Sequence, residues 1–478
     1  MPSEHPLEIP EIVSYMASYM RKRDHTACAL VSKTWYQVFN PFIWHHISWN
    51  YERPFLPEAI HRHTQLVRTV KTVYAYKKET AKLLKLRLPN LVSLNVVYNF
   101  EQDMKEWIIK HPSMTRLTLR GAWSLDSKLW NSLLGFRHLK DFTMSYREIG
   151  ESVIDTFWQL CTHLERLEIV ESCIPQQGNL LSMTFPSIKQ LELDRMEDVS
   201  VLEFMQRCPN LTSFKYSHSQ ERARFVSSFS ELVSARIWPH LHSVSIGWRE
   251  VAEDSVLRII GGMQRINDFK ISGSLYSFRS TAMELLRPHF SNIRVLHLRR
   301  FKEWQISRLA QEILTSCPLL EQLTAPPINA CVVAEGKPWV CMRLRELELI
   351  FVYMDSTLHH LQPLVFNQLA RLVQLEKWYQ TDYGGDRCNR RLDLTLVNGL
   401  GKLSTLRSLR SIGFHHSSQV MGQHEIDWIF EHWTNLENIG GNLNMLDGAI
   451  NEGLKEQLKE RGITFRPSYW WRSKYCHE

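Results

Sequence analysis

The chain has 478 residues, 44% of them hydrophobic and 22% charged, with a formal net charge of +7. This composition is that of an ordinary globular protein, and no stretch approaches the roughly 18 unbroken apolar residues that a membrane-spanning helix needs. Basic clusters are two or three residues long and acidic residues lie between them, so the charge pattern does not favour nucleic-acid binding.

The nine cysteines are an odd number, widely spread and without a Cys-x-x-Cys pair. They indicate free thiols in a reducing compartment rather than a disulfide framework or a zinc site. The amino terminus lacks the basic and then apolar regions of a secretory signal. We therefore expect a cytoplasmic or nuclear protein.

The first 44 residues predict three short helices. Pro10 suits the first turn of a helix, and Ile12, Met16 and Tyr19 follow it at helical spacing. Asp24 is a candidate N-cap for the second helix, and a third apolar stripe ends at Asn40-Pro41. A segment of this size rarely sustains a core without a partner, yet it is too apolar to be a tail.

The order of these residues resembles the F-box. The resemblance rests on the segments Ile9-Pro10-Glu11-Ile12, Asp24, Val31-Ser32-Lys33-Thr34-Trp35 and Pro41-Phe42-Ile43-Trp44. His25 stands where the family usually has Leu after Asp, and Ser32 replaces Cys. The resemblance implies docking on a Skp-type adaptor and, through it, on a cullin–RING ubiquitin ligase. The residues implied in adaptor binding are Ile9, Pro10, Ile12, Val31 and Trp35. The alternative is a helical cap that shields the first unit of a repeat array.

From about residue 67 the chain repeats a pattern in which positions one, four and six are apolar. Clear copies begin at Leu91, Met114, Leu139, Leu164, Ile188, Leu211, Leu241, Ile266, Ile293, Leu320 and Leu344, and weaker ones at Val67, Leu372, Leu406 and Leu436. Neighbouring clear copies lie about 23 to 30 residues apart, which is typical of leucine-rich repeats. Alternation along a strand turns positions four and six inward, and stacked units bury this row together.

Two further regularities support this register. Helical segments with one apolar face lie between the strands, for example at 153–161 and 306–317. Several prolines stand two residues before a strand's first apolar position, where proline ends a helix and favours an extended chain: Pro89, Pro112, Pro186, Pro209, Pro239 and Pro318. Cys161, Cys208 and Cys317 fall in one equivalent slot, which His111 occupies in another copy. Equivalent slots predict buried packing residues rather than metal ligands.

Recognition is expected on the concave face, where motif positions two, three and five face solvent. These positions are polar with both signs of charge, for example Arg116, Asp141, Glu165 and Lys189. Large aromatic residues follow the strands: Tyr98, Trp123, Tyr146, Trp248, Tyr353 and Trp378. Aromatic residues dominate many protein interfaces, although some of these must pack between repeats. Our hypothesis is that Trp123, Tyr146 and Trp248 belong to a substrate-binding rim.

The sequence predicts an α/β protein, with a three-helix F-box followed by a curved leucine-rich-repeat solenoid that has parallel strands on its concave face and helices on its convex face. The expected parts are a helical domain (1–50), a linker or first cap (51–66), an array of about 14 irregular repeats (67–464) and an aromatic, basic tail (465–478). The tail is expected to cap the last repeat, the alternative being a partner contact.

Searches for catalytic motifs find no P-loop, no Gly-x-Gly-x-x-Gly, no His-Glu-x-x-His and no Gly-x-Ser-x-Gly. We therefore expect no enzyme, cofactor or metal site. The first hypothesis is a substrate-recognition subunit of a Skp–cullin–F-box ubiquitin ligase that binds an unidentified protein target. The second is a leucine-rich-repeat scaffold without a ligase role, and the third a nucleic-acid-associated repeat protein.

Overall fold

The computed structural model describes residues 6–20, 22–50, 57–73, 82–97, 102–121, 126–145, 149–171, 183–194, 198–217, 223–250, 252–274, 280–298, 307–352, 360–380, 392–414, 419–444 and 448–466. The chain forms two compact units, 1–211 and 212–478. Both belong to a leucine-rich-repeat fold of parallel strands and connecting helices, as the sequence predicts.

Unit 1 begins with a helical module, by which we mean residues 6–44. Its elements are the 3₁₀ turn η1 (Pro6–Glu8) and the helices α1 (Pro10–Tyr19), α2 (Lys22–Ala29) and α3 (Lys33–Trp44). The expected helix end at Asn40-Pro41 is wrong, because α3 continues through Pro41 to Trp44. A proline inside a helix removes one backbone donor, and here the helix tolerates the loss close to its end.

Seven parallel strands follow in the described part of unit 1. They are β1 (His46–Asn50), β2 (Thr69–Val73), β3 (Ser93–Val97), β4 (Arg116–Arg120), β5 (Asp141–Ser145), β6 (Arg166–Val170) and β7 (Gln190–Asp194). Each pairs with the next in sequence, and equivalent motif positions stand side by side, as Leu94 and Leu117 do in β3 and β4. The sheet starts at His46, inside the range predicted for the helical domain.

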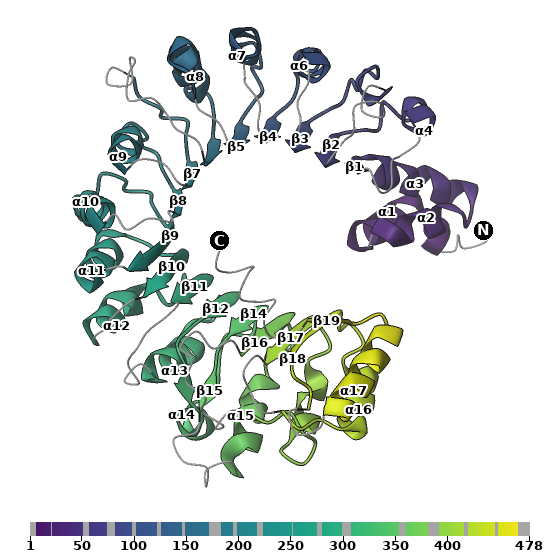
Figure 1. The fold of residues 1–478 in the computed structure, drawn as a ribbon, viewed down its shortest axis with the longest axis vertical. Helices are drawn as coiled ribbons and strands as arrows, with labels where there is room; N and C mark the ends of the chain where they lie inside the picture. The colour runs from purple at the N-terminus through teal and green to yellow at the C-terminus, as the bar shows by residue number, and fades with distance from the viewer. Residues whose placement is uncertain are drawn as a thin grey trace. The chain divides into compact units, whose positions relative to one another are not determined.

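Helices connect these strands and lie on one side of them (Figure 1). The helices are α4 (Pro57–Arg62), α6 (Gln102–Ile109), α7 (Ser127–Leu134), α8 (Ile154–Cys161, preceded by the 3₁₀ turn Glu151–Val153) and α9 (Asp198–Gln206). Leucines at motif positions four and six, such as Leu117 and Leu119, are buried between the two layers. There they meet aromatic helix residues: Trp130 of α7 lies edge-on to Phe157 of α8 at 5.8 Å.

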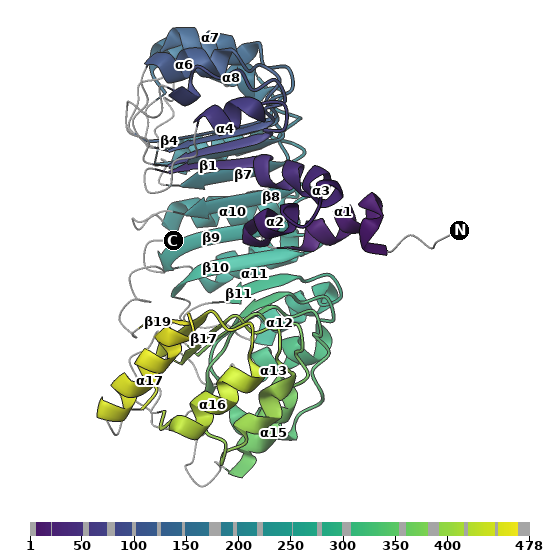
Figure 2. The same ribbon diagram turned by 90° about the vertical axis from the view of Figure 1, so that its right-hand side faces the viewer.

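The helical module lies at the end of this sheet, next to β1 (Figures 1 and 2). The His45 carbonyl, directly after α3, accepts hydrogen bonds from the amides of Arg68 and Thr69 at 3.1 and 2.8 Å. Trp44 of α3 stacks on His63 at 4.4 Å between ring centroids. The last turn of α3 is therefore joined to the first repeat by backbone and ring contacts.

Unit 2 continues the same repeat. Its strands are β8 (Ser213–Ser217), β9 (Ser243–Glu250), β10 (Asp268–Ser274), β11 (Val295–Leu298), β12 (Gln322–Thr324), β14 (Glu346–Glu348), β16 (Lys377–Tyr379), β17 (Ser411–Phe414), β18 (Asn438–Gly441) and β19 (Thr464–Arg466). Neighbours in this series pair in parallel. The short strands β13 (Ile328–Asn329) and β15 (Phe351–Val352) form a separate parallel pair.

Helices again alternate with the strands of unit 2. They are α10 (Ala223–Ser234), α11 (Glu253–Gly262), α12 (Ser280–Leu286), α13 (Ser307–Ser316), α14 (Ala330–Glu335), α15 (Gln362–Leu369), α16 (Gln423–His432) and α17 (Gly448–Glu460), with 3₁₀ turns at Arg287–His289 and Leu400–Thr405. None of the helices in these described ranges has the length and the apolar composition that spanning a membrane requires.

Two of the weaker repeat copies are displaced from the expected register. Leu375 and Leu409 stand two residues before β16 and β17, as Leu91 does before β3, so these repeats begin three residues after Leu372 and Leu406. Both leucines of each pair are fully buried, which is why the sequence pattern did not separate them. The expected starts at Val67 and Leu436 agree with β2 and β18.

Candidate functional site

The helical module closes a small core of its own. Val13, Ala17, Ala29 and Phe39 are buried there, and six partly buried side chains pack around them: Met20, Cys28, Trp35, Val38, Phe42 and Ile43. The two departures from the F-box pattern have roles in this packing. His25 is buried against the rings of Phe39 and Phe42, and the Ser32 hydroxyl caps α3 by accepting a hydrogen bond from the amide of Trp35 at 3.2 Å.

Many apolar side chains of the module remain outside this core. The exposed ones are Leu7, Ile12, Tyr15, Met16, Tyr19, Leu30, Val31 and Tyr36. Tyr15, Met16 and Tyr19 lie three, four and seven residues after Ile12, so the four side chains form one stripe along α1. Leu30, 83% exposed, and Val31 lie in the turn before α3. Single exposed apolar residues are ordinary on a protein surface, whereas a concentration of this kind marks an interaction site.

The five residues implied in adaptor binding divide into two groups. Pro10, Ile12 and Val31 are exposed, whereas Ile9 and Trp35 are half-buried. The Trp35 indole donates a hydrogen bond to the Leu7 carbonyl at 2.8 Å and stacks on Phe39 at 5.5 Å. Trp35 therefore supports the module from inside. Tyr15, Tyr19 and Leu30 are not among the predicted adaptor-binding residues, although the helical spacing already placed Tyr19 on the apolar face of this helix.

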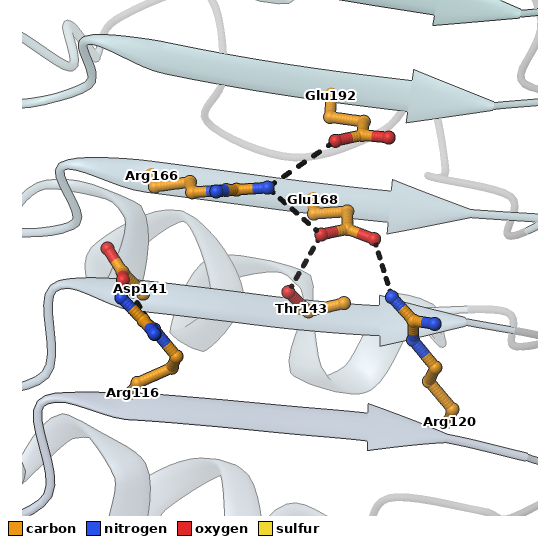
Figure 3. A network of polar contacts seen from close by, with 7 residues as sticks. All are labelled: Arg116, Arg120, Asp141, Thr143, Arg166, Glu168 and Glu192. Carbon is orange, nitrogen blue, oxygen red and sulfur yellow. Dashed lines mark hydrogen bonds and ion pairs between the residues drawn. The ribbon is translucent and has the colours of Figure 1, made fainter. Parts of the chain in front are cut away.

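A second candidate surface is the face of strands β4–β7 that points away from the helices. Glu168 of β6 lies at its centre with a side chain only 11% exposed. Its carboxylate accepts hydrogen bonds from the Arg120 guanidinium at 3.0 Å and the Thr143 hydroxyl at 3.2 Å, and it lies 3.5 Å from Arg166 (Figure 3). A buried carboxylate is tolerated because these donors compensate for its lost water.

Further ion pairs extend this network across neighbouring strands. The Arg116 Nε atom donates to Asp141 at 2.8 Å, and Arg166 lies 3.5 Å from Glu192 (Figure 3). Lys140, just before β5, contacts Glu165 at 2.5 Å. This hydrogen bond raises the pKa of Lys140 and lowers the pKa of Glu165, so both groups stay charged over a wider pH range. The network joins four successive repeats through side chains.

The hypothesis of an aromatic rim is largely untested by the structure. Trp123 and Tyr146 lie outside the described residues, as do Tyr98, Tyr353 and the tail 467–478. Trp248 is part of β9, and its side chain is not described. Trp378 does not belong to a rim, because it is fully buried in β16. The three-residue shift of this repeat places it at motif position four, which faces the core.

The cysteine slot is a packing position, as predicted. Cys161, Cys208 and Cys317 are fully buried, and His111 is buried in the same slot. Burial raises the pKa of the Cys317 thiol to about 12, which keeps it protonated and unreactive. Among the residues that the structure describes, no group of His, Cys, Asp and Glu could hold a metal ion.

Comparisons with known proteins add distant likenesses only. No model of a protein family matches the chain, and no curated protein matches it. Among solved structures, an internalin (InlF) of Listeria monocytogenes is 14% identical over 75% of this chain and 82% of its own, with a TM-score of 0.34. A chain of the Rad7–Elc1 complex of yeast is 12% identical over 97% of this chain and 98% of its own, with a TM-score of 0.45. Likeness at this level says nothing about function.

Proposed function

We propose that the chain is the substrate-recognition subunit of a Skp–cullin–F-box ubiquitin ligase. The helical module would dock on a Skp-type adaptor, and the repeats would hold a target protein near the ligase. The chain itself would contribute no chemistry, and its part in catalysis would be proximity.

One observation carries this proposal. The module has closed its own core, yet the α1 stripe and the turn before α3 still expose large apolar side chains. A helical cap that serves only its own first repeat would direct these side chains toward that repeat. The module instead contacts the repeats through the end of α3, where Trp44 and His45 lie. Covering the exposed groups with an adaptor would remove apolar area from water at about 25 cal/mol per Å².

The direct test is titration of the purified full chain with a Skp-type adaptor. Replacing Ile12 and Val31 by aspartate places two charges in the contact without disturbing the module core, since both side chains are exposed. Central interface residues typically contribute about 2 kcal/mol or more, so the double variant should lose at least about 30-fold in affinity.

The matched control is the Leu364→Asp/Val373→Asp variant. These two side chains are exposed apolar groups of unit 2, and their replacement should leave adaptor binding unchanged. Trp35→Ala is a poor probe because its indole supports the module from inside. If the unmodified chain does not bind the adaptor, the ligase role is refuted and the scaffold hypothesis is favoured.

A further inference from the structure

Two rows of alternating charge cross strands β4–β7. The first consists of the residues just before β5, β6 and β7, namely Lys140, Glu165 and Lys189. The second consists of Arg116, Asp141 and Arg166, which the strand register places side by side on β4, β5 and β6. In both rows the cations recur on every second strand with a carboxylate between them.

The cations form the outer layer of this surface. The Arg116 side chain is 60% exposed against 23% for Asp141, and Arg120 is 48% exposed against 11% for Glu168. The same order of exposure is found in the ion pairs that carboxylates on or beside the strands form with Lys140, Arg166, Lys189, Arg294, Arg345 and Lys377.

The ion pairs of the helices do not share this order of exposure. Lys105 is 12% exposed against 40% for Asp126, and Lys455 is 23% exposed against 72% for Glu452, although Arg287 and Lys459 are more exposed than their acidic partners. The greater length of lysine and arginine therefore does not by itself explain the order on the strands. On the strand face, the carboxylates are the more buried members of these ion pairs, and the lysines and arginines are the more exposed members.

Two of these exposed cations, Arg116 and Lys140, retain hydrogen-bond donors. Arg116 uses only its Nε atom for Asp141, and the structure records no other polar contact for its guanidinium among the described residues. Lys140 contacts Glu165, and its side chain is 59% exposed. A guanidinium carries five N–H donors and an ammonium three, so both can accept a second carboxylate without giving up the first.

We propose that this surface binds an extended, acidic segment of a protein partner, with carboxylate side chains three residues apart. Like charges two strands apart are separated by about 9.5 Å, since parallel strands lie about 4.8 Å from one another. In a peptide with the extended polyproline II conformation, which has three residues per turn, side chains three residues apart lie on the same side of the peptide and about 9.3 Å from one another. A carboxylate at every third position can therefore meet Lys140 and Lys189, or Arg116 and Arg166, at the same time. The inference rests on the proposed role of the repeats in target binding and adds the chemical class of the target segment.

The test uses the full chain and labelled peptides of about a dozen residues, followed by fluorescence polarisation at low salt. One peptide carries glutamate at every third position and serine elsewhere, and a second has the same composition with its glutamates adjacent. A third carries lysine in place of glutamate. The spaced acidic peptide should bind most tightly of the three. Raising the salt concentration should weaken its binding, because the contacts are between exposed charges.

The matched variants are Lys140→Gln/Lys189→Gln and, as a control, Lys455→Gln/Lys459→Gln on α17. Exposed ion pairs typically contribute about 0.2 to 1 kcal/mol each, so the first variant should bind the spaced peptide about two- to thirtyfold more weakly. The control should bind it as the unmodified chain does.

Several results would overturn the proposal. These are no binding of the spaced peptide, equal binding of the lysine or adjacent-glutamate peptide, or no effect of the Lys140/Lys189 change. Tighter binding of a single-stranded oligonucleotide of equal charge would assign the surface to nucleic acid instead. None of these assays contains the adaptor, and Lys140→Gln/Lys189→Gln should leave adaptor titration unchanged. The two proposals can therefore fail separately.

Discussion

The helical module and the strand face of β4–β7 expose opposite kinds of side chain, apolar on the module and charged on the strands. The module exposes tyrosines and aliphatic groups beside a small core around Phe39. The strand face buries its leucines beneath it and exposes charges that are paired across strands. Exposed apolar area is costly until a partner covers it, whereas paired charges are stable in water. This difference suggests a long-lived contact at the module and an exchangeable one at the strands.

The largest effect is expected from a change that destroys the core of the helical module alone. Phe39 is fully buried and packs against Trp35 and His25, so Phe39→Ala should cost about 3–5 kcal/mol. We expect rapid proteolysis within residues 6–44 and loss of adaptor binding, while the acidic peptide still binds the strands. Simultaneous loss of both activities would show that the two surfaces are not independent.

Replacing Glu168 tests whether the ion-pair network of the strands stabilises the repeats. Glu168→Ala leaves Arg120 and Arg166 without their shared carboxylate, and we expect a loss of about 1–3 kcal/mol in the free energy of unfolding by urea. Glu452→Ala on α17 is the matched control, because its side chain is 72% exposed and should contribute little. An equal loss of stability in the two variants would contradict a stabilising role of Glu168 in this network.

His111 gives the repeats a pH dependence that the paired surface charges do not. Its Nε2 atom accepts a hydrogen bond from the Leu88 amide at 3.0 Å, and its Nδ1 atom lies 2.8 Å from the Trp107 carbonyl. Burial lowers the pKa of His111 below its usual 6.5. The neutral ring is therefore favoured in the folded state, and its contribution is complete above pH 6.5 and lost as the pH falls.

Urea unfolding between pH 7.5 and 5 should show this loss in the unmodified chain. His111→Leu should be less stable at neutral pH and should show less pH dependence. The control, His138→Leu, removes an exposed histidine and should keep the original pH dependence. An unchanged pH profile in His111→Leu would contradict this role.

The smallest expected effect concerns Lys140. Because this lysine is exposed, Lys140→Gln should leave the melting temperature of the chain unchanged. The same variant should still bind the spaced acidic peptide more weakly than the unmodified chain does. A clear fall in melting temperature would mean that the lysine serves the fold rather than recognition.

The sequence predicts the repeat well because strand and helix periodicities repeat many times. It fails where two apolar residues compete for one motif position, as Leu372 and Leu375 do, and this shift alone turned buried Trp378 into an expected rim residue. The module was predicted from its motif order, but a motif does not tell which side chains face inward. Trp35 and Val31 belong to the same motif, and only Val31 is exposed. The greater exposure of the cations than of their carboxylate partners on the strands depends on three-dimensional packing and leaves no signal in the sequence.

Hydrogen–deuterium exchange of the full chain, measured with and without a Skp-type adaptor, distinguishes an adaptor-binding module from a helical cap. We expect slower exchange at α1 and at residues 28–36, with no change at β4–β7. Unchanged exchange across residues 6–36 at saturating adaptor, or protection confined to the strands, would contradict it.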